Sequence, residues 1–164
     1  MLVVAPQQFG FQKELSCSHA IYSFRAVVDH YVSGQSTLNV AFVDLSKAFD
    51  RVNHNILFFK LMMRNFPPVI LKLLMVWYNN SIVTVRWNMF YSHAFPLTTG
   101  VRQGGVLSPI LFCVYIDDVV RRLELSRMWC WMAGCCLGCI LYADDLILMS
   151  PSVCDLQTRS SATA

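Results

Sequence analysis

Two pairs of adjacent aspartates are the residues of this chain most suited to chemistry. One pair lies in YIDD at positions 115–118 and the other in YADD at positions 142–145. In the first pair each acid precedes an arginine by four residues, at Arg121 and Arg122. That spacing and order favour ion pairs along a helix. We therefore expect Asp117 and Asp118 to lie on a solvated helix face and to have a structural role.

The YADD pair has no such basic partner. The nearest bases in the sequence are Arg127 and Arg159, and neither is at a pairing distance along one element. Two carboxylates about 4 Å apart repel by roughly 4 kcal/mol at an effective dielectric constant of about 20. The pair is stable beside a cation or with one acid protonated, and Mg²⁺ takes oxygen ligands of this kind. An exposed turn, where aspartate is common, is the alternative for this segment.

A third acid favours the metal interpretation. Asp44 follows the apolar run VAFV, at the expected end of a strand. If that strand neighbours a hairpin that turns at Asp144 and Asp145, the three carboxylates can converge. Such a trio can hold two Mg²⁺ ions, which activate an attacking hydroxyl and clamp a leaving phosphate group. Asp50, in the same stretch, is expected to cap or pair locally.

The surrounding sequence predicts the elements that must position these acids. Apolar residues recur at helical spacing after a serine cap at Ser16 or Ser18, and Gly34 ends this helix. Ser108 is expected to cap a later helix, with Pro109 in its first turn. The other expected elements are a buried strand over 37–46, helices over 54–66 and 69–78, a hairpin of 81–87 with 89–97, a loop over 98–105, and a hairpin over 137–150.

The composition is unusually apolar. Apolar residues make up 55% of the 164 residues and charged residues 14%, with a net charge of +3. A free-standing soluble domain has about 25% charged residues, so the chain is either a membrane protein or a piece of a larger one. The longest uncharged run near the C-terminus, 128–143, has 16 residues. A spanning helix needs about 20 residues, so we favour the piece of a larger protein. The charge permits a nucleic-acid partner without requiring one.

Seven cysteines include a CxxC pair at Cys136 and Cys139. A structural zinc site needs four ligands at suitable spacing, and the histidines lie far upstream. We expect the cysteines to be small apolar filler in a reducing compartment.

Three segments together resemble the motifs of a known enzyme family. AFVDLSKAFD, GVRQGGVLSPILF and YADD are similar to motifs A, B and C of reverse transcriptases, in that order. The residues of these motifs resemble those in the enzymes of non-LTR (LINE-type) retrotransposons and group II introns. The segment QFGFQKELSCSHAI also resembles the family's GFRxGxS segment, with Gln12 in place of an arginine. The resemblance covers roughly residues 7–158.

The resemblance implies an α+β fold of the right-hand polymerase palm type, with an antiparallel sheet backed by helices. It implies RNA-templated DNA synthesis, with an RNA template, a DNA primer and deoxynucleoside triphosphates as partners. Asp44 and Asp144 would be the catalytic ligands of two Mg²⁺ ions, which Mn²⁺ could replace. Asp145 would complete the acidic cluster.

The resemblance also implies roles for five substrate-binding residues. Phe49 would crowd a ribose 2′-hydroxyl and so select deoxynucleotides, with core packing as the alternative. Gln103 and Gly104 would lie along the nascent base pair, since glycine lets backbone approach a ligand closely. Arg102 would contact phosphate or only solvent. Tyr142 would sit beside the primer end or merely pack.

The resemblance also predicts what this chain lacks. We expect a partial reverse transcriptase domain over residues 1–158 and a frayed tail over 159–164. The fingers are incomplete, a thumb does not fit, and no lysine follows Lys72 to approach the leaving pyrophosphate. Activity of the chain alone is therefore expected to be weak or absent. No membrane partner is expected, and the nucleus or cytoplasm is the default location.

Two other functions stay open. A non-enzymatic retroelement remnant would bind nucleic acid or a protein partner through exposed palm faces. An RNA-templated RNA polymerase can also have paired aspartates in this position, although Phe49 and RQGGVLSP argue against it. RNA binding that survives loss of the acids would favour the remnant, and ribonucleotide incorporation would favour the RNA polymerase.

Overall fold

The computed structural model describes residues 4–125, 130–132 and 135–163. They form two compact units, and each is described by itself. The first unit covers residues 47–115, and the second contains the described residues of 3–46 and 116–164. The acids of YADD and Asp44 belong to the second unit, whereas the loop before Ser108 belongs to the first.

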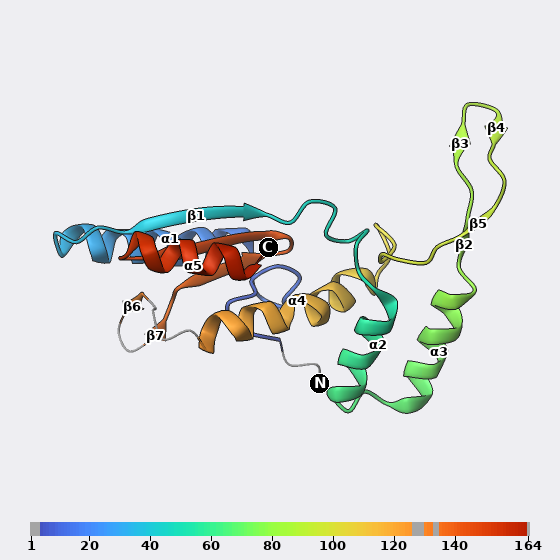
Figure 1. The fold of residues 1–164 in the computed structure, drawn as a ribbon, viewed down its shortest axis with the longest axis horizontal. Coiled ribbons are helices and arrows are strands. Elements are labelled where there is room, and N and C mark those ends of the chain that lie inside the picture. The colour runs from blue at the N-terminus through green and yellow to red at the C-terminus, as the bar shows by residue number, and fades with distance from the viewer. Residues whose placement is uncertain (1–3, 126–129, 133–134, 164) are drawn as a thin grey trace. The chain divides into compact units, whose positions relative to one another are not determined.

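A three-stranded antiparallel sheet is the centre of the second unit. It consists of β1 (Asn39–Asp44), β8 (Cys139–Tyr142) and β9 (Asp145–Ser150), in the order β1-β9-β8 (Figure 1). β8 and β9 form a hairpin, and β1 pairs along the other side of β9. The expected late hairpin and its neighbouring early strand are thus confirmed.

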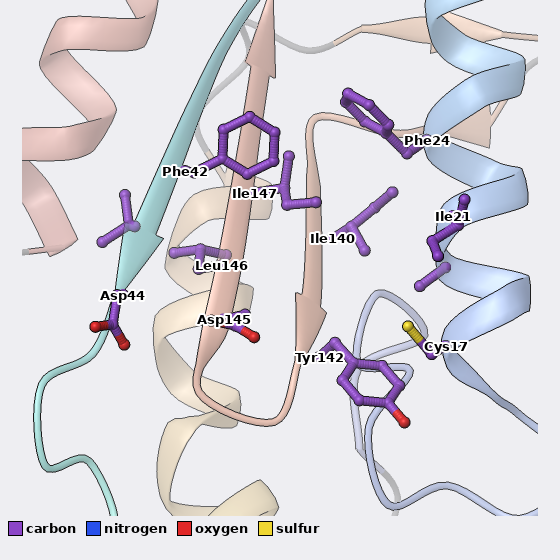
Figure 2. Close-up of a pocket in the computed structure, with 12 residues that line it drawn as sticks. Cys17, Ile21, Phe24, Phe42, Asp44, Ile140, Tyr142, Asp145, Leu146 and Ile147 are labelled. Atoms are coloured by element: carbon purple, nitrogen blue, oxygen red, sulfur yellow. The ribbon is translucent and has the colours of Figure 1, made fainter.

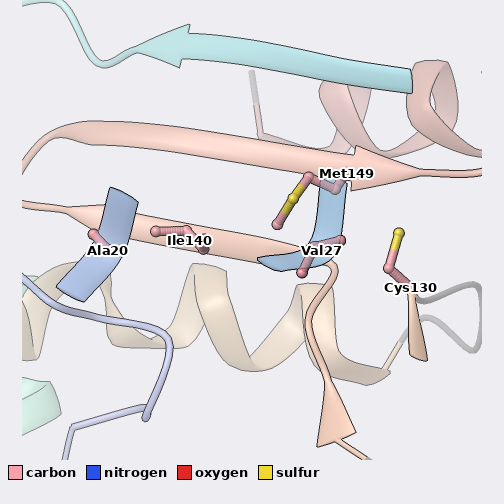
Figure 3. Close-up of a cluster of buried hydrophobic side chains, with 5 residues drawn as sticks. All are labelled: Ala20, Val27, Cys130, Ile140 and Met149. Atoms are coloured by element: carbon pink, nitrogen blue, oxygen red, sulfur yellow. The ribbon is translucent and has the colours of Figure 1, made fainter. Parts of the chain in front are cut away.

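The sheet packs against helices from both ends of the chain. α1 (Cys17–Ser33) begins at Ser16, whose hydroxyl and backbone form a capping box with His19, and Gly34 caps its other end. Val27 of this helix forms a core cluster with Ile140 and Met149 of the sheet (Figure 3). The C-terminal helix α5 (Val153–Thr163) contacts β9 and β1.

A short N-terminal segment extends the sheet beyond β8. Gln8 forms a parallel bridge with Leu141. The Phe9 N–H donates to the Leu141 carbonyl at 2.8 Å, and the Leu141 N–H donates to the Gln7 carbonyl at 2.9 Å. The segment therefore pairs with the outer side of β8 and leads the chain towards the YADD turn.

Two helices supply much of the core of the first unit. α2 (His54–Met63) begins at Asn53, whose side chain accepts hydrogen bonds from the first N–H groups of the helix. α3 (Pro68–Asn79) begins with a proline, which suits the first turn of a helix. Their buried side chains include Leu57, Leu61, Leu71, Leu74 and Tyr78. Both helices are confirmed where the sequence predicts them.

A long hairpin and a loop follow these helices. The hairpin has two short ladders, β2 (Ile82–Val83) with β5 (Phe95–Pro96) and β3 (Arg86–Trp87) with β4 (Phe90–Tyr91). The loop leads to α4 (Ser108–Leu125), which begins in the first unit and continues in the second. β6 (Trp131–Met132) and β7 (Cys135–Cys136) form one more short pair. None of the helices in the described ranges is long and apolar enough to cross a membrane.

The expectation that the early strand is buried is wrong. β1 is not buried, because it is the outer strand of the sheet and Phe42 is 72% exposed. Residues Val153–Thr163 form a helix, which the sequence analysis did not predict, and the frayed tail over 159–164 stays a prediction. Ser152 explains its start, since the hydroxyl accepts a hydrogen bond from the Asp155 N–H at 3.4 Å. The last residue, 164, lies outside the described residues, and the domain boundary at 158 stays a prediction.

Candidate active site

One end of the three-stranded sheet brings two strands and a turn together. In the register of β1 and β9, Asp44 lies directly opposite Asp145. Both side chains line the same pocket (Figure 2). Asp144 precedes Asp145 in the turn, and its carbonyl accepts a hydrogen bond from the Leu45 N–H at 3.4 Å. The backbones of all three acids therefore meet at one end of the sheet.

The turn that carries Asp144 is tight and closely packed. Its first residue, Ala143, has a φ of 58°, in the left-handed region that two-residue hairpin turns require and that alanine disfavours. Gly10 lies against it, since a Cβ on Gly10 would be 2.3 Å from the Ala143 nitrogen. Only glycine fits at position 10 without moving the turn. The N-terminal segment thus fixes the acidic turn from outside the hairpin.

The donor set at this end fits a hard divalent cation. Asp44 and Asp145 are exposed and Asp144 is half-buried. Like charges directly opposite each other in a sheet repel, so a cation between these strands would stabilise them. Mg²⁺ is commonly held by one or two carboxylates and substrate oxygens. Across the described ranges, no three His, Cys, Asp or Glu side chains are gathered as a metal site. The structure thus brings the three residues to one end without gathering their carboxyl groups around one point.

Tyr142 lies beside the acids. It is opposite Asp145 in the β8–β9 register and lines the same pocket. Its half-buried ring also packs against the core cluster, which agrees with the packing alternative.

Phe49 lies in the first unit and is half-buried. Its ring stacks on the buried ring of Phe112, with the centroids 4.4 Å apart and an angle of 20° between the planes. Its carbonyl accepts a hydrogen bond from the Val101 N–H at 2.8 Å. The ring is therefore held on one side by packing, and the loop of motif B is tied to its backbone.

The motif B loop runs against the residues that follow Phe49. Gly100 has a φ of +88°, and a Cβ there would be 2.9 Å from the Asp50 carbonyl oxygen. The Gln103 amide donates to the Asp50 carboxylate at 3.3 Å. Asp50 therefore pairs across the unit, so the expectation of a local partner is wrong. Gly104 has a φ of +79°, and a Cβ there would meet nothing within 4 Å, so its surroundings are open.

Arg102 is exposed but not free in solvent. Its guanidinium donates to the Ser81 hydroxyl at 3.0 Å and lies 5.7 Å from the centre of the Trp77 ring. The neighbouring Tyr78 is buried, and burial raises its pKa while the charge of Arg102 partly lowers it. Arg102 thus has structural partners in addition to any phosphate it would contact.

The YIDD pair lies on α4, as the sequence predicts, but Asp117 is not solvated. It is 0% exposed, and its carboxylate accepts hydrogen bonds from the Ala5 N–H at 2.6 Å and from Arg121 Nε at 2.6 Å. The helical ion pair with Arg121 is confirmed. The solvated face is wrong for Asp117 because the N-terminal segment covers it.

Sequence reasoning missed one position in each unit that lies against a predicted site residue. Gly10 was not singled out, although a glycine within QFGF is a signal for close backbone approach. Phe112, the stacking partner of Phe49, lies in an apolar helix segment and has no distinguishing signal.

Comparison with known proteins identifies the family. The family model described as reverse transcriptase (RNA-dependent DNA polymerase) matches residues 2–163. The chain is 32% identical over 124 residues to the Retrovirus-related Pol polyprotein from type-1 retrotransposable element R2 of Nasonia vitripennis. It is 27% identical over 158 residues to the corresponding polyprotein from type-2 retrotransposable element R2DM of Drosophila melanogaster. These alignments cover 76% and 96% of this chain but only 12% and 15% of the two relatives.

A solved structure shows the same fold. Apo telomerase from Candida tropicalis, truncated from its C-terminal domain, superposes with a TM-score of 0.67 at 16% identity, over 95% of this chain and 32% of that chain. The expected α+β fold of the right-hand polymerase palm type is thus confirmed. Together with the match over residues 2–163, these findings show that the chain belongs to the reverse transcriptase family and that its curated relatives are polymerases of non-LTR retrotransposons.

Proposed function

We propose that this chain supplies the catalytic palm of an RNA-directed DNA polymerase. Its partners would be an RNA template, a DNA primer and deoxynucleoside triphosphates. The observation that carries the proposal is the placement of Asp44 opposite Asp145, with Asp144 in the adjoining turn. This arrangement joins the acids of motifs A and C, which lie 100 residues apart between Asp44 and Asp144.

Reverse transcriptases in general use divalent metal ions. Asp44 and Asp144 would hold two Mg²⁺ ions, or Mn²⁺ in their place, and Asp145 would complete the acidic cluster. Bound there, the ions would supply activation of the primer 3′-hydroxyl and neutralisation of the leaving pyrophosphate. The chain itself would hold the acids in place. Asp44 and Asp145 lie at paired strand ends, and Asp144 lies in a turn against which Gly10 packs.

Four residues of motifs A and B would contact the nucleotide. The Phe49 ring would exclude a ribose 2′-hydroxyl, and its stacking on Phe112 supports this role by fixing the ring. Gln103 and Gly104 would lie along the nascent base pair, which the open surroundings of Gly104 support. Arg102 would contact phosphate, and Tyr142 of the second unit would lie beside the primer end.

Primer extension tests the proposal. A DNA primer on an RNA template is incubated with the chain, deoxynucleotides, and Mg²⁺ or Mn²⁺. Extension is expected to be weak, and Asp44→Asn or Asp144→Asn should abolish it. Asp29→Asn is the matched control, since that acid is 70% exposed on α1. Equal extension by the wild type and Asp144→Asn would contradict the catalytic role.

Metal binding gives a second readout that does not need turnover. Mn²⁺ binding, followed by electron paramagnetic resonance, should weaken at least tenfold in Asp44→Asn and stay unchanged in Asp29→Asn. Unchanged binding in both variants would show that these acids are not the metal ligands.

Sugar selection tests Phe49. Phe49→Ala should raise ribonucleotide incorporation relative to deoxynucleotide incorporation, because the side chain that would crowd the 2′-hydroxyl is gone. Preferential use of ribonucleotides by the wild type would instead favour an RNA-templated RNA polymerase.

A non-enzymatic binding function is the second candidate, and the β3–β4 hairpin favours it. Trp87 is 77% exposed, Phe90 is 78% exposed, and the Arg86 guanidinium lies 5.7 Å from the centre of the exposed Tyr91 ring. Exposed aromatic rings beside a cation suit stacking on single-stranded nucleic acid. This function predicts salt-sensitive RNA binding that survives Asp44→Asn and Asp144→Asn but weakens in Trp87→Ala.

A further inference from the structure

We propose that the pocket between α1 and the three-stranded sheet binds a small amphipathic cation, with an aromatic body and one protonated amine. The pocket has a volume of about 490 Å³. That volume lies within the range of roughly 300–1,000 Å³ in which small-molecule sites are found. The proposal concerns binding without added divalent metal, because Asp44 and Asp145 line the pocket and are also proposed above as part of the metal site. It does not depend on polymerase activity.

The walls of the pocket are apolar. Ile21 and Phe24 line it from α1, and Phe42, Ile140 and Ile147 line it from the sheet. The Phe24 and Phe42 rings meet edge to face, with their centroids 6.2 Å apart. Figure 2 shows these side chains towards one end of the pocket. They form a surface on which an aromatic body can pack.

The other end of the pocket is acidic. In the β1–β9 register Phe42 is opposite Ile147, and two residues further along each strand Asp44 is opposite Asp145. Figure 2 shows both carboxylates at this end, with Tyr142 near by. The pocket's lining, all within the described part of the chain, contains no Lys, Arg or His.

The apolar end and the acidic end of the pocket together determine which kind of ligand it favours. A neutral apolar molecule would gain no attraction from the two adjacent carboxylates, and an anion would be repelled by them. An ammonium group at the acidic end can make charge-assisted hydrogen bonds while the body fills the apolar end. The complementarity in charge and shape therefore favours an aromatic amine over its alcohol and acid analogues.

Cys17 provides a site-specific reporter of occupancy. Its thiol is exposed and lines the pocket, whereas Cys154, also exposed, lies on α5 and does not line it. Alkylation of both thiols by iodoacetamide, followed by peptide mass spectrometry, compares the two in one molecule. The probes are 3,3-diphenylpropylamine, 3,3-diphenylpropan-1-ol and 3,3-diphenylpropanoic acid.

The amine should slow alkylation of Cys17 without slowing that of Cys154. It should reach half-maximal protection at a concentration about tenfold lower than the alcohol, and the acid should not protect. Equal protection by all three probes, equal slowing at both cysteines, or no protection by the amine would overturn the proposal.

Variants locate the two halves of the site. Asp145→Asn should remove the advantage of the amine over the alcohol, whereas Asp29→Asn should keep it. Phe42→Ala should weaken the binding of both probes, and Phe59→Ala, an exposed phenylalanine of the other unit, should not. Circular dichroism of each variant checks the fold, and ligand-observed NMR measures binding without the thiol. An amine preference that persists in folded Asp145→Asn would refute the acidic half of the site.

Discussion

Replacing Gly10 with alanine should disturb the YADD turn, although residue 10 carries no reactive group. The added Cβ would lie 2.3 Å from the Ala143 nitrogen, 3.1 Å from the Ala143 Cα and 3.1 Å from the Tyr142 carbonyl carbon. All three are backbone atoms, which cannot rotate away as a flexible side chain does. Either the turn or the N-terminal segment must therefore shift.

The cost of either response can be worked from the structure. Forcing an extra methyl group into a well-packed site costs about 1–3 kcal/mol. If the segment moves away instead, the two backbone hydrogen bonds that join it to Leu141 are lost, at about 1 kcal/mol each. Either response therefore lowers the free energy of unfolding by about 2 kcal/mol, which reduces the folding equilibrium constant roughly 30-fold.

Urea unfolding of Gly10→Ala measures this loss, and hydrogen exchange locates it. The Leu141 amide donates to the Gln7 carbonyl, so its exchange should accelerate in the variant. Primer extension should fall with it, because the turn carries Asp144. Gly34→Ala is the matched control, since a Cβ there would lie 3.3 Å from the His30 carbonyl oxygen, at a helix end with a φ of −76°.

The reasoning has a clear point of failure. If Gly10→Ala and Gly34→Ala lose equal stability, the close approach does not constrain the fold. Unchanged exchange of the Leu141 amide in a destabilised Gly10→Ala protein would place the damage elsewhere than at the turn.

Three further perturbations have defined outcomes. Asp117→Asn should lower the unfolding free energy by about 2 kcal/mol, because it weakens two charge-assisted hydrogen bonds of a buried carboxylate. The control Asp29→Asn, at an exposed ion pair, should lower it by less than about 0.5 kcal/mol. Urea unfolding measures both changes. Burial raises the pKa of Tyr78 above its usual 10.0, so the neutral phenol is favoured in the folded state. The stabilisation is complete below that usual pKa and is lost as the pH rises above it through the folded-state pKa. Tyr78→Phe should reduce this loss above about pH 10 in parallel unfolding titrations. Ala143→Gly should raise the unfolding free energy by about 1 kcal/mol, because glycine relieves the positive φ, and a lower melting temperature in calorimetry would contradict this.

The elements around the acids could be predicted because their signals are local. Asp44 ends a short apolar run and YADD interrupts another, so the strand and the turn follow from patterns a few residues long. The helix caps at Ser16 and Gly34 are equally local. No pattern within either segment shows that the Asp44 strand pairs with the YADD hairpin. That expectation comes from the resemblance to motifs A and C.

What could not be predicted depends on packing between distant segments. Nothing near Asp117 indicates that the backbone at Ala5, 112 residues away, covers it. The bond between Gln103 and Asp50 joins residues 53 apart. The α5 helix has a serine cap but little apolar periodicity, so its contacts with the sheet had no visible counterpart in the sequence.

The position of β1 has a consequence for how the protein should be handled. Within the described residues it is the outer strand of its sheet, paired with β9 alone. Outer strands can accept a further extended chain through their backbone groups. A second molecule added along this strand would pair with the segment that ends in Asp44 and restrict access to that carboxylate. If the proposed function holds, self-association would then lower primer extension per molecule, and dilution would restore it.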